Sequence, residues 1–228
     1  MFWSFCSPKG GVGVSVTATA VAARLARTSP VLVVDFSGDI SELLGIDTHT
    51  KPGVGDWLHA DAQVGVEALD RLVLDGPNGL RLLPVGERDR SGVTTERLVQ
   101  LVSHLGAMSM VVADVGVVGD LPMAWGSVVC AAGDRTTLVV RACYLGLRRA
   151  RRLGVSVDEL FEVREPGRAL GTLDIETVFH QPVVARCPVD PNIARCADAG
   201  LLAGRVPRPL RRAVDDLLAA GAPLEVVR

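Results

Sequence analysis

The chain has 228 residues, of which 48% are hydrophobic and 22% are charged, and its formal net charge at pH 7 is −2. This length and apolar content fit one folded domain with a sizeable core, and they exclude a disordered chain. The net charge near zero also excludes a strongly basic protein that would bind nucleic acid along its whole surface.

Short apolar segments alternate with helical segments rich in Ala, Leu and Arg along the sequence. This alternation predicts an α/β fold in which a mostly parallel twisted sheet carries helices on both faces, within a single domain that spans residues 1–228. A core strand begins almost at Met1, so we expect no signal segment and a cytoplasmic protein. The most apolar window, Leu105–Gly119, contains Asp114 and several glycines, so we expect a buried strand there and no membrane insertion.

The first unit predicted along the chain is a strand, a glycine-rich loop and a helix. The apolar run Phe2–Cys6 is the strand, and Val16–Ala26 has helical spacing. Between them the sequence reads Pro-Lys-Gly-Gly-Val-Gly-Val-Ser-Val. Backbone amides around Gly10, Gly11 and Gly13 can turn toward an anion, and the N-terminus of the helix adds a partial positive charge. The loop therefore predicts a phosphate-binding site.

Two positions decide what this loop can do. Ser15 stands where such loops supply the hydroxyl that binds Mg²⁺, but Val14 stands where they supply a lysine for the β and γ phosphates. The cation of the loop, Lys9, precedes the glycines, and it is one of only two lysines in a chain with 22 arginines. A lysine in such an arginine-rich chain indicates that a compact ammonium group matters at this position.

These residues resemble the ParA/MinD group of P-loop ATPases, whose deviant Walker A loop reads Lys-Gly-Gly-x-Gly-Lys-Ser/Thr-Thr. Val14 and Val16 depart from this pattern, and five residues match it: Lys9, Gly10, Gly11, Gly13 and Ser15. The strands Val31–Asp35 and Met110–Asp114, the latter at the Walker B position, extend the resemblance. It implies the P-loop NTPase fold, a role in positioning or partitioning, and an ATP and Mg²⁺ site formed by Lys9, Gly10, Gly11, Val12, Gly13, Val14, Ser15, Asp35 and Asp114.

The resemblance also implies roles for individual residues. In the family, the lysine at the Lys9 position reaches across a two-fold interface to the partner's nucleotide, which implies a homodimer with ATP between its subunits. Ser15 would hold Mg²⁺, with Asp35 and Asp114 around the ion. Where the family has an Asn that contacts adenine, this chain reads Val163-Arg164-Glu165, so its base recognition departs from the family.

A second departure lies after the strand Val31–Asp35. The family reads Asp-x-Asp there, and its second carboxylate is associated with activating the attacking water, whereas this chain reads Asp35-Phe36-Ser37. A serine hydroxyl can position a water at neutral pH but does not take its proton. Asp39 is a candidate catalytic replacement if its loop bends back toward the site. Because the lysine of the loop is also missing, we expect negligible hydrolysis.

The rest of the sequence predicts further strands and helices in alternation. The segment Val115–Pro122 corresponds to the family's second switch. The expected helices are Ile40–Leu44, Val54–Ala60, Thr94–Leu105, one from Tyr144, Thr172–Phe179, a short one that follows Pro191 and ends at Ala199, and Pro209–Ala220. The expected strands are Thr137–Val140, Glu159–Val163 and Val183–Arg186. The segments Leu72–Leu74 and Leu80–Pro84 flank a turn cluster and are interpreted either as a hairpin or as a passage from a loop into a strand.

The helix predicted from Tyr144 carries a second cluster of interest. Its apolar positions lie on one side, and on the other side four arginines fall within an arc of about 160°: Arg148, Arg149, Arg151 and Arg152. Three interpretations of this face remain open, which are a solvated surface, a docking surface for an acidic protein partner and, least favoured, a contact with nucleic acid.

Three functional hypotheses follow. The first is a dimerising, nucleotide-responsive switch that binds ATP with little or no hydrolysis and positions or regulates a partner complex. The second is a nucleotide-free pseudo-ATPase scaffold that uses the fold only as an interaction surface. The third is an active ATPase in which Lys9 and Asp39 replace the missing groups.

Overall fold

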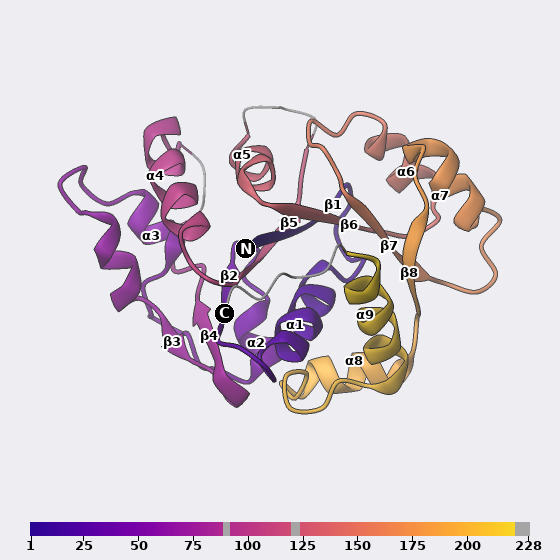
Figure 1. Ribbon diagram of the computed structural model, residues 1–228, viewed down its shortest axis with the longest axis horizontal. Coiled ribbons are helices and arrows are strands. Elements are labelled where there is room, and N and C mark those ends of the chain that lie inside the picture. Colours follow the sequence, from indigo (N-terminus) through magenta and orange to yellow (C-terminus); the bar gives the residue numbers. More distant parts are fainter. Residues whose placement is uncertain (89–91, 120–123, 222–228) are drawn as a thin grey trace.

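The computed structural model describes residues 1–88, 92–119 and 124–221, which form an eight-stranded sheet with helices on both faces (Figure 1). The strand order is β3-β4-β2-β5-β1-β6-β7-β8, and neighbouring strands run parallel except for β3 and β4. The expected α/β class with a mostly parallel sheet is confirmed. The strands are β1 (Phe2–Ser7), β2 (Val31–Asp35), β3 (Leu74–Asp75), β4 (Leu80–Leu83), β5 (Val111–Val117), β6 (Arg135–Val140), β7 (Glu159–Arg164) and β8 (Val183–Pro188).

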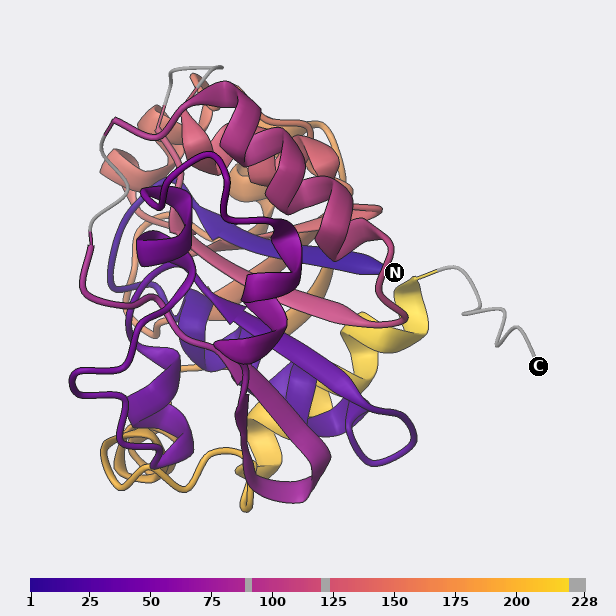
Figure 2. The ribbon, with the colours of Figure 1, turned by 90° about the vertical axis from the view of Figure 1, so that its left-hand side faces the viewer.

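The sheet lies between two helical layers (Figures 1 and 2). Successive side chains of a strand point to opposite faces, so β1 places Trp3 and Phe5 in one core and Phe2 and Cys6 in the other. One layer contains α1 (Val14–Leu25), α2 (Ile40–Leu44), α8 (Pro191–Asp198) and α9 (Arg208–Ala220). The other contains α3 (Val54–Leu58), α4 (Thr95–Gly106), α5 (Trp125–Ala132), α6 (Tyr144–Ala150) and α7 (Thr172–Phe179).

Most elements expected from the sequence are present with small shifts at their ends. The helix expected at Val16 begins at Val14, directly after its N-cap Gly13. The pattern did not predict α5 or the 3₁₀ segments Val66–Arg71 and Pro77–Gly79. The sequence of α5 contains a glycine and two adjacent valines and has no side-chain cap, so packing against β1 and β5 stabilises this helix.

Two further expectations need comment. Part of the segment expected to act as the second switch, 120–122, lies outside the described residues. The described residues contain no helix with both the length and the apolar character needed to cross a bilayer.

A buried arginine links the C-terminal helix to the central strands. Arg135 at the start of β6 is 8% exposed, pairs with Glu159 in β7, and donates to the carbonyl of Leu217 in α9 at 3.0 Å. Its guanidinium lies 3.9 Å from the ring centre of Trp3, whose indole N–H donates to Thr137 Oγ1 at 2.8 Å. Burial raises the pKa of Glu159, and the charge of Arg135 opposes that rise.

Arg135→Ala should lower the free energy of unfolding by about 3 to 5 kcal/mol, because it leaves the Glu159 carboxylate buried without its counter-charge. The double variant Arg135→Met with Glu159→Leu should recover much of that loss, since it removes both charges and keeps apolar volume. Urea unfolding followed by circular dichroism measures both values. A double variant as unstable as the single one would contradict this account.

Candidate functional site

The glycine loop lies where the chain changes direction across the sheet. β1 lies between β5 and β6 in the sheet. From β1 the chain first builds the half of the sheet on the β5 side, beginning with β2, and from β5 it crosses to β6 and builds the other half. In parallel sheets ligands bind at such a switch point, beyond the carboxyl ends of the strands. The register also pairs Asp35 at the end of β2 with Asp114 in β5. The sheet therefore brings the loop and two carboxylates to one edge.

Two glycines with positive φ shape the loop. Gly11 has φ 72° and Gly13 has φ 97°, and a side chain at either position would strain the backbone. Gly13 is the N-cap of α1, which has no side-chain cap. The first amides of a 12-residue helix are thus left without a side-chain acceptor at the loop, which is the arrangement that binds anions.

The residue that departs most from a phosphate-binding loop is anchored in the core. Val14 is 7% exposed and belongs to the hydrophobic cluster on the α1 side of the sheet, as does Val12, which is 4% exposed. Val14 still contributes to the wall of the pocket above the loop. The loop itself therefore presents an aliphatic group where a cation would neutralise phosphate.

This pocket has a volume of about 670 Å³ and collects residues from several elements. Hydroxyls and carboxylates dominate its polar lining, and Arg141 is the one cationic side chain among its described lining residues. The loop residues that line it are Gly10, Gly11, Gly13, Val14 and Ser15. Lys9 is outside that lining, although it is near enough to Glu165 to help lower the pKa of that carboxyl, behind the larger effects of Arg168 and Arg141.

The carboxylate of Asp35 organises the turn after β2. Its Oδ1 accepts hydrogen bonds from the backbone N–H groups of Ser37 and Gly38 at 3.0 and 2.7 Å, and its Oδ2 accepts from Ile40 at 3.0 Å. Asp35 is fully buried, and this burial raises its pKa while the backbone hydrogen bonds oppose the rise. The turn bends back over the loop, and Asp39 Oδ2 accepts from Ser15 Oγ at 3.1 Å.

Ser37 connects the loop to the Walker B carboxylate. Its hydroxyl donates to Asp114 Oδ2 at 2.6 Å and also lies 3.2 Å from Asp35 Oδ1. The Oγ atoms of Ser15 and Ser37 are 3.3 Å apart. Asp39, Ser15, Ser37 and Asp114 therefore lie in a row in which each side chain is within hydrogen-bond distance of the next. Each serine hydroxyl has one proton and donates it to a carboxylate, so the contact between the two serines is a close approach and not a further hydrogen bond.

These oxygen donors fit Mg²⁺, which prefers hard oxygen ligands and keeps several waters or phosphate oxygens in its shell. In the part of the chain that the structure describes, no three His, Cys, Asp or Glu side chains form a metal-binding group by themselves. Ser15 would therefore hold the ion together with phosphate oxygens and water, with Asp35 and Asp114 around it. The donor set suits an ion that arrives with a phosphate ligand.

Asp114 is fully buried, and its pKa is raised from 3.8 to about 7, first by burial and then by the charge of Asp35, against the hydrogen bonds of Ser37, Ser15 and Gly116. Between pH 4 and 7 the folded protein keeps a proton that the unfolded chain has lost. Stability therefore falls as the pH rises through this window and levels off above about pH 7.

Asp114→Asn removes this titration and should flatten the pH dependence of stability in the metal-free protein. Between pH 5 and pH 8 in EDTA, the wild type should lose on the order of 1 to 3 kcal/mol more unfolding free energy than the variant. Urea unfolding at both pH values measures the difference. Parallel losses in the two proteins would refute the assigned pKa shift.

A smaller apolar pocket of about 160 Å³ adjoins the first one. Gly13, Val16 and Arg141 line both pockets, and the remaining walls of the smaller one come mainly from the ends of β7 and β8 and from α8. Neither Arg141 nor the bridging role of Ser37 was predicted from the sequence. A charged residue directly after the apolar strand segment Thr137–Val140 was the available signal for Arg141.

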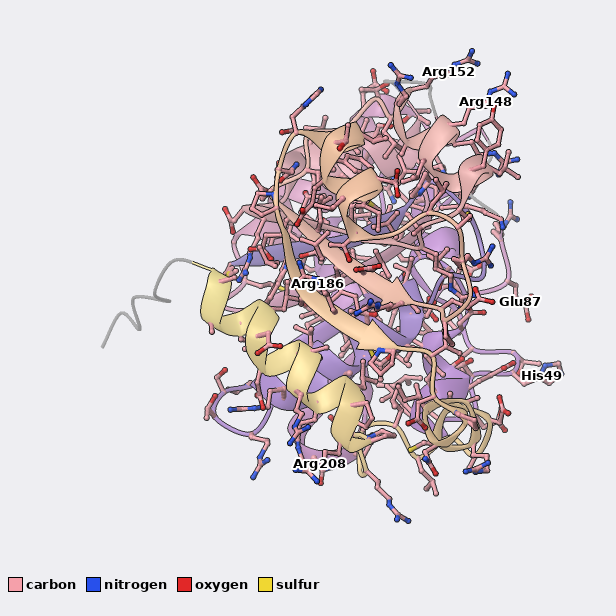
Figure 3. All side chains as sticks on the ribbon, turned by 90° about the vertical axis from the view of Figure 1, so that its right-hand side faces the viewer. His49, Glu87, Arg148, Arg152, Arg186 and Arg208 are labelled. Atoms are coloured by element: carbon pink, nitrogen blue, oxygen red, sulfur yellow. The ribbon has the colours of Figure 1, made fainter. Side chains whose placement is uncertain are left out.

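The arginines of α6 lie at the surface beside this site. Arg148, Arg149 and Arg152 line a cavity of about 390 Å³ together with Pro8 and Val117, and Val117 also lines the pocket at the loop. Arg148, Arg149, Arg151 and Arg152 are exposed, while Gly146, Leu147 and Ala150 are buried, as the helical pattern predicted. The helix ends at Ala150, so Arg151 is its C-cap and Arg152 lies in the following turn. Figure 3 shows the side chains of Arg148 and Arg152 extending outward at the same edge of the molecule.

Sheet order, glycine loop and paired carboxylates define a P-loop nucleotide-binding fold of the α/β class. No protein-family model and no curated protein sequence matches the chain. Solved structures do match, and the chain has the fold of the ParA/MinD-type ATPases, which confirms the fold that the resemblance implied.

Three of these structures illustrate the similarity. The MinD cell division ATPase of Pyrococcus furiosus aligns with a TM-score of 0.74 and 18% identity over 97% of this chain and 100% of that one. MinD in the MinC:MinD complex of Aquifex aeolicus gives 0.73 and 17% over 98% of each chain. An McdA variant of Cyanothece in complex with ATP gives 0.69 and 16% over 99% of each.

Proposed function

We propose that the protein is a nucleotide-responsive switch of the ParA/MinD type, which binds ATP with Mg²⁺, hydrolyses it poorly or not at all, and positions or regulates a partner complex in the cytoplasm. One observation carries the proposal: the glycine loop and the Ser15 hydroxyl line a pocket in which Val14 stands at the position of the phosphate-binding lysine. The pocket retains the means to hold phosphate, but the loop lacks the group that would neutralise a phosphoryl transfer.

The shape of the site supports a nucleotide as the ligand. The larger pocket is polar around the loop, and the adjoining smaller one is walled by apolar residues that include Phe161, Val163 and Leu210. A phosphate chain in the first and a base in the second would share Gly13 and Arg141 as their common wall. Among proteins of this fold, a MinD from Pyrococcus horikoshii was solved with Mg-ADP and an McdA variant with ATP.

The placement of Lys9 supports a dimer in which each subunit completes the other's site. Lys9 is outside the described lining of its own subunit's pocket, and the proposal assigns its ammonium to the nucleotide of a second copy. A partner surface is also proposed at Arg148, Arg149, Arg151 and Arg152, where four exposed guanidinium groups suit an acidic protein. Nucleic acid remains the less favoured ligand of that surface.

An active ATPase is the second candidate function, and one contact favours it. Asp39 Oδ2 accepts from Ser15 Oγ at 3.1 Å, so the loop that carries this carboxylate does bend back to the pocket, as a replacement base would need. Its hydrogen bond to Ser15 opposes that role, because the carboxylate is already engaged with the group expected to hold Mg²⁺. The rate of ATP hydrolysis distinguishes an active ATPase from the proposed switch.

The central prediction is saturable binding of MgATP that depends on Lys9, together with turnover below about 1 per minute. Isothermal titration should show weaker binding by Lys9→Ala, because the variant removes a cation shared across the dimer, and native mass measurement should show fewer dimers. Lys51→Ala, which changes the other lysine of the chain at an exposed position, is the matched control and should behave as wild type. No binding at millimolar nucleotide would leave only a nucleotide-free scaffold, and brisk phosphate release would favour the active ATPase.

Val14→Lys tests whether the backbone of the glycine loop still has a shape that binds phosphate. A lysine there has its stem in the core cluster and its ammonium at the pocket wall, so affinity for MgATP should rise about tenfold or more. Val14→Met, which adds length without charge, is the control and should not raise affinity. If the lysine variant folds and binds no more tightly, the loop does not bind phosphate.

A further inference from the structure

The pocket around the loop has an unfavourable charge balance for a triphosphate. Its described lining includes the carboxylates of Asp39, Glu42 and Asp198, and against these stands a single cation, Arg141. A bound triphosphate carries several negative charges that the site must offset with positive groups or metal. Because Val14 supplies no charge and Lys9 is outside the described lining, the side chain of this subunit that faces the pocket with a positive charge comes from outside the loop.

Arg141 reaches the site from the strand next to β1. β6 pairs with β1 in parallel, with Leu138 opposite Cys6, so three residues further along each chain Arg141 and Lys9 emerge at the same edge of the sheet. Arg141 lines the large pocket and also the small apolar one. It therefore stands at the junction where a phosphate chain would pass from the loop toward a base.

The donors of Arg141 are largely uncommitted. Its Nε is buried and has no hydrogen-bond partner among the described residues. Its Nη1 lies 3.8 Å from Glu165 Oε2, which is too long for a hydrogen bond. That same oxygen already accepts from Arg168 Nε at 2.9 Å and from Arg168 Nη2 at 2.6 Å. A buried N–H without an acceptor costs free energy, and a ligand oxygen that accepts its hydrogen bond would remove that cost.

We infer that Arg141 is the phosphate-binding cation of this site and that it takes over from β6 the task that a loop lysine performs in other P-loop proteins. The inference rests on the proposed nucleotide function and names the residue that makes it feasible. The planar fork of a guanidinium binds two oxygens of a phosphate group at once, whereas an ammonium acts as a point charge. The ligand class is the phosphate chain of a nucleoside di- or triphosphate.

The test compares Arg141→Ala with Arg27→Ala in the full chain. Arg27 follows the far end of α1 from the loop, is exposed and is outside the described lining of both pockets, so its loss changes net charge equally. Isothermal titration with MgATP should show an affinity at least about tenfold weaker in the Arg141 variant and within about twofold of wild type in the Arg27 variant. MgADP should show the same pattern, and Arg141→Lys should recover only part of the affinity.

Inorganic tripolyphosphate distinguishes failure of this inference from failure of the proposed function. If wild type binds MgATP and both alanine variants match it, Arg141 has no phosphate role and the switch proposal stands. If wild type binds tripolyphosphate through Arg141 but not MgATP, the anion site stands and the nucleotide function falls. Binding of neither ligand overturns both. Arg141→Gln, which keeps most of the side-chain stem, replaces the alanine variant if thermal unfolding shows that the latter is misfolded.

Discussion

The carboxylate of Asp35 determines the geometry of the whole site. It is buried at the end of β2, where an ionised group is costly, and three backbone N–H groups of the following turn satisfy its two oxygens. Those bonds close the turn, and the closed turn places Ser37 between Asp114 and Ser15. They also bring Asp39 back over the loop. The serines and carboxylates lie close together because the backbone of the turn folds around the buried carboxylate of Asp35.

The positive charge of the pocket does not come from the loop, although phosphate-binding loops of this kind normally supply a lysine. The loop keeps its turn geometry through Gly11 and Gly13, but Val14 is packed into the core. The remaining cation at the pocket enters from β6, on the opposite side of β1 from the carboxylates. The cation and the buried carboxylates of the site are thus supplied by strands on opposite sides of β1.

The sequence was sufficient to predict the sheet, its main elements and the glycine loop, because these depend on local periodicity and on the strong signals of glycine and buried apolar runs. It could not reveal that the turn at 37–40 folds back, since that depends on hydrogen bonds to Asp35 across several residues. Nor could it place Arg141, whose relation to the loop arises only when β6 pairs with β1. Helix α5 was missed because its residues favour strand and tertiary packing decides the outcome.

The C-terminal helix shows how the molecule's layers constrain each other. The apolar stripe of α9, formed by Leu210, Val214 and Leu217, is buried in the same cluster as α1, and Arg24 of α1 donates to Asp215 of α9 at 2.9 Å. Arg135 also donates a hydrogen bond to the carbonyl of Leu217, near the end of α9. Any role that required this helix to detach, such as lying along a lipid surface, would uncover the back of the helix that begins at the glycine loop. Detachment of α9 would therefore also disturb the pocket at the glycine loop.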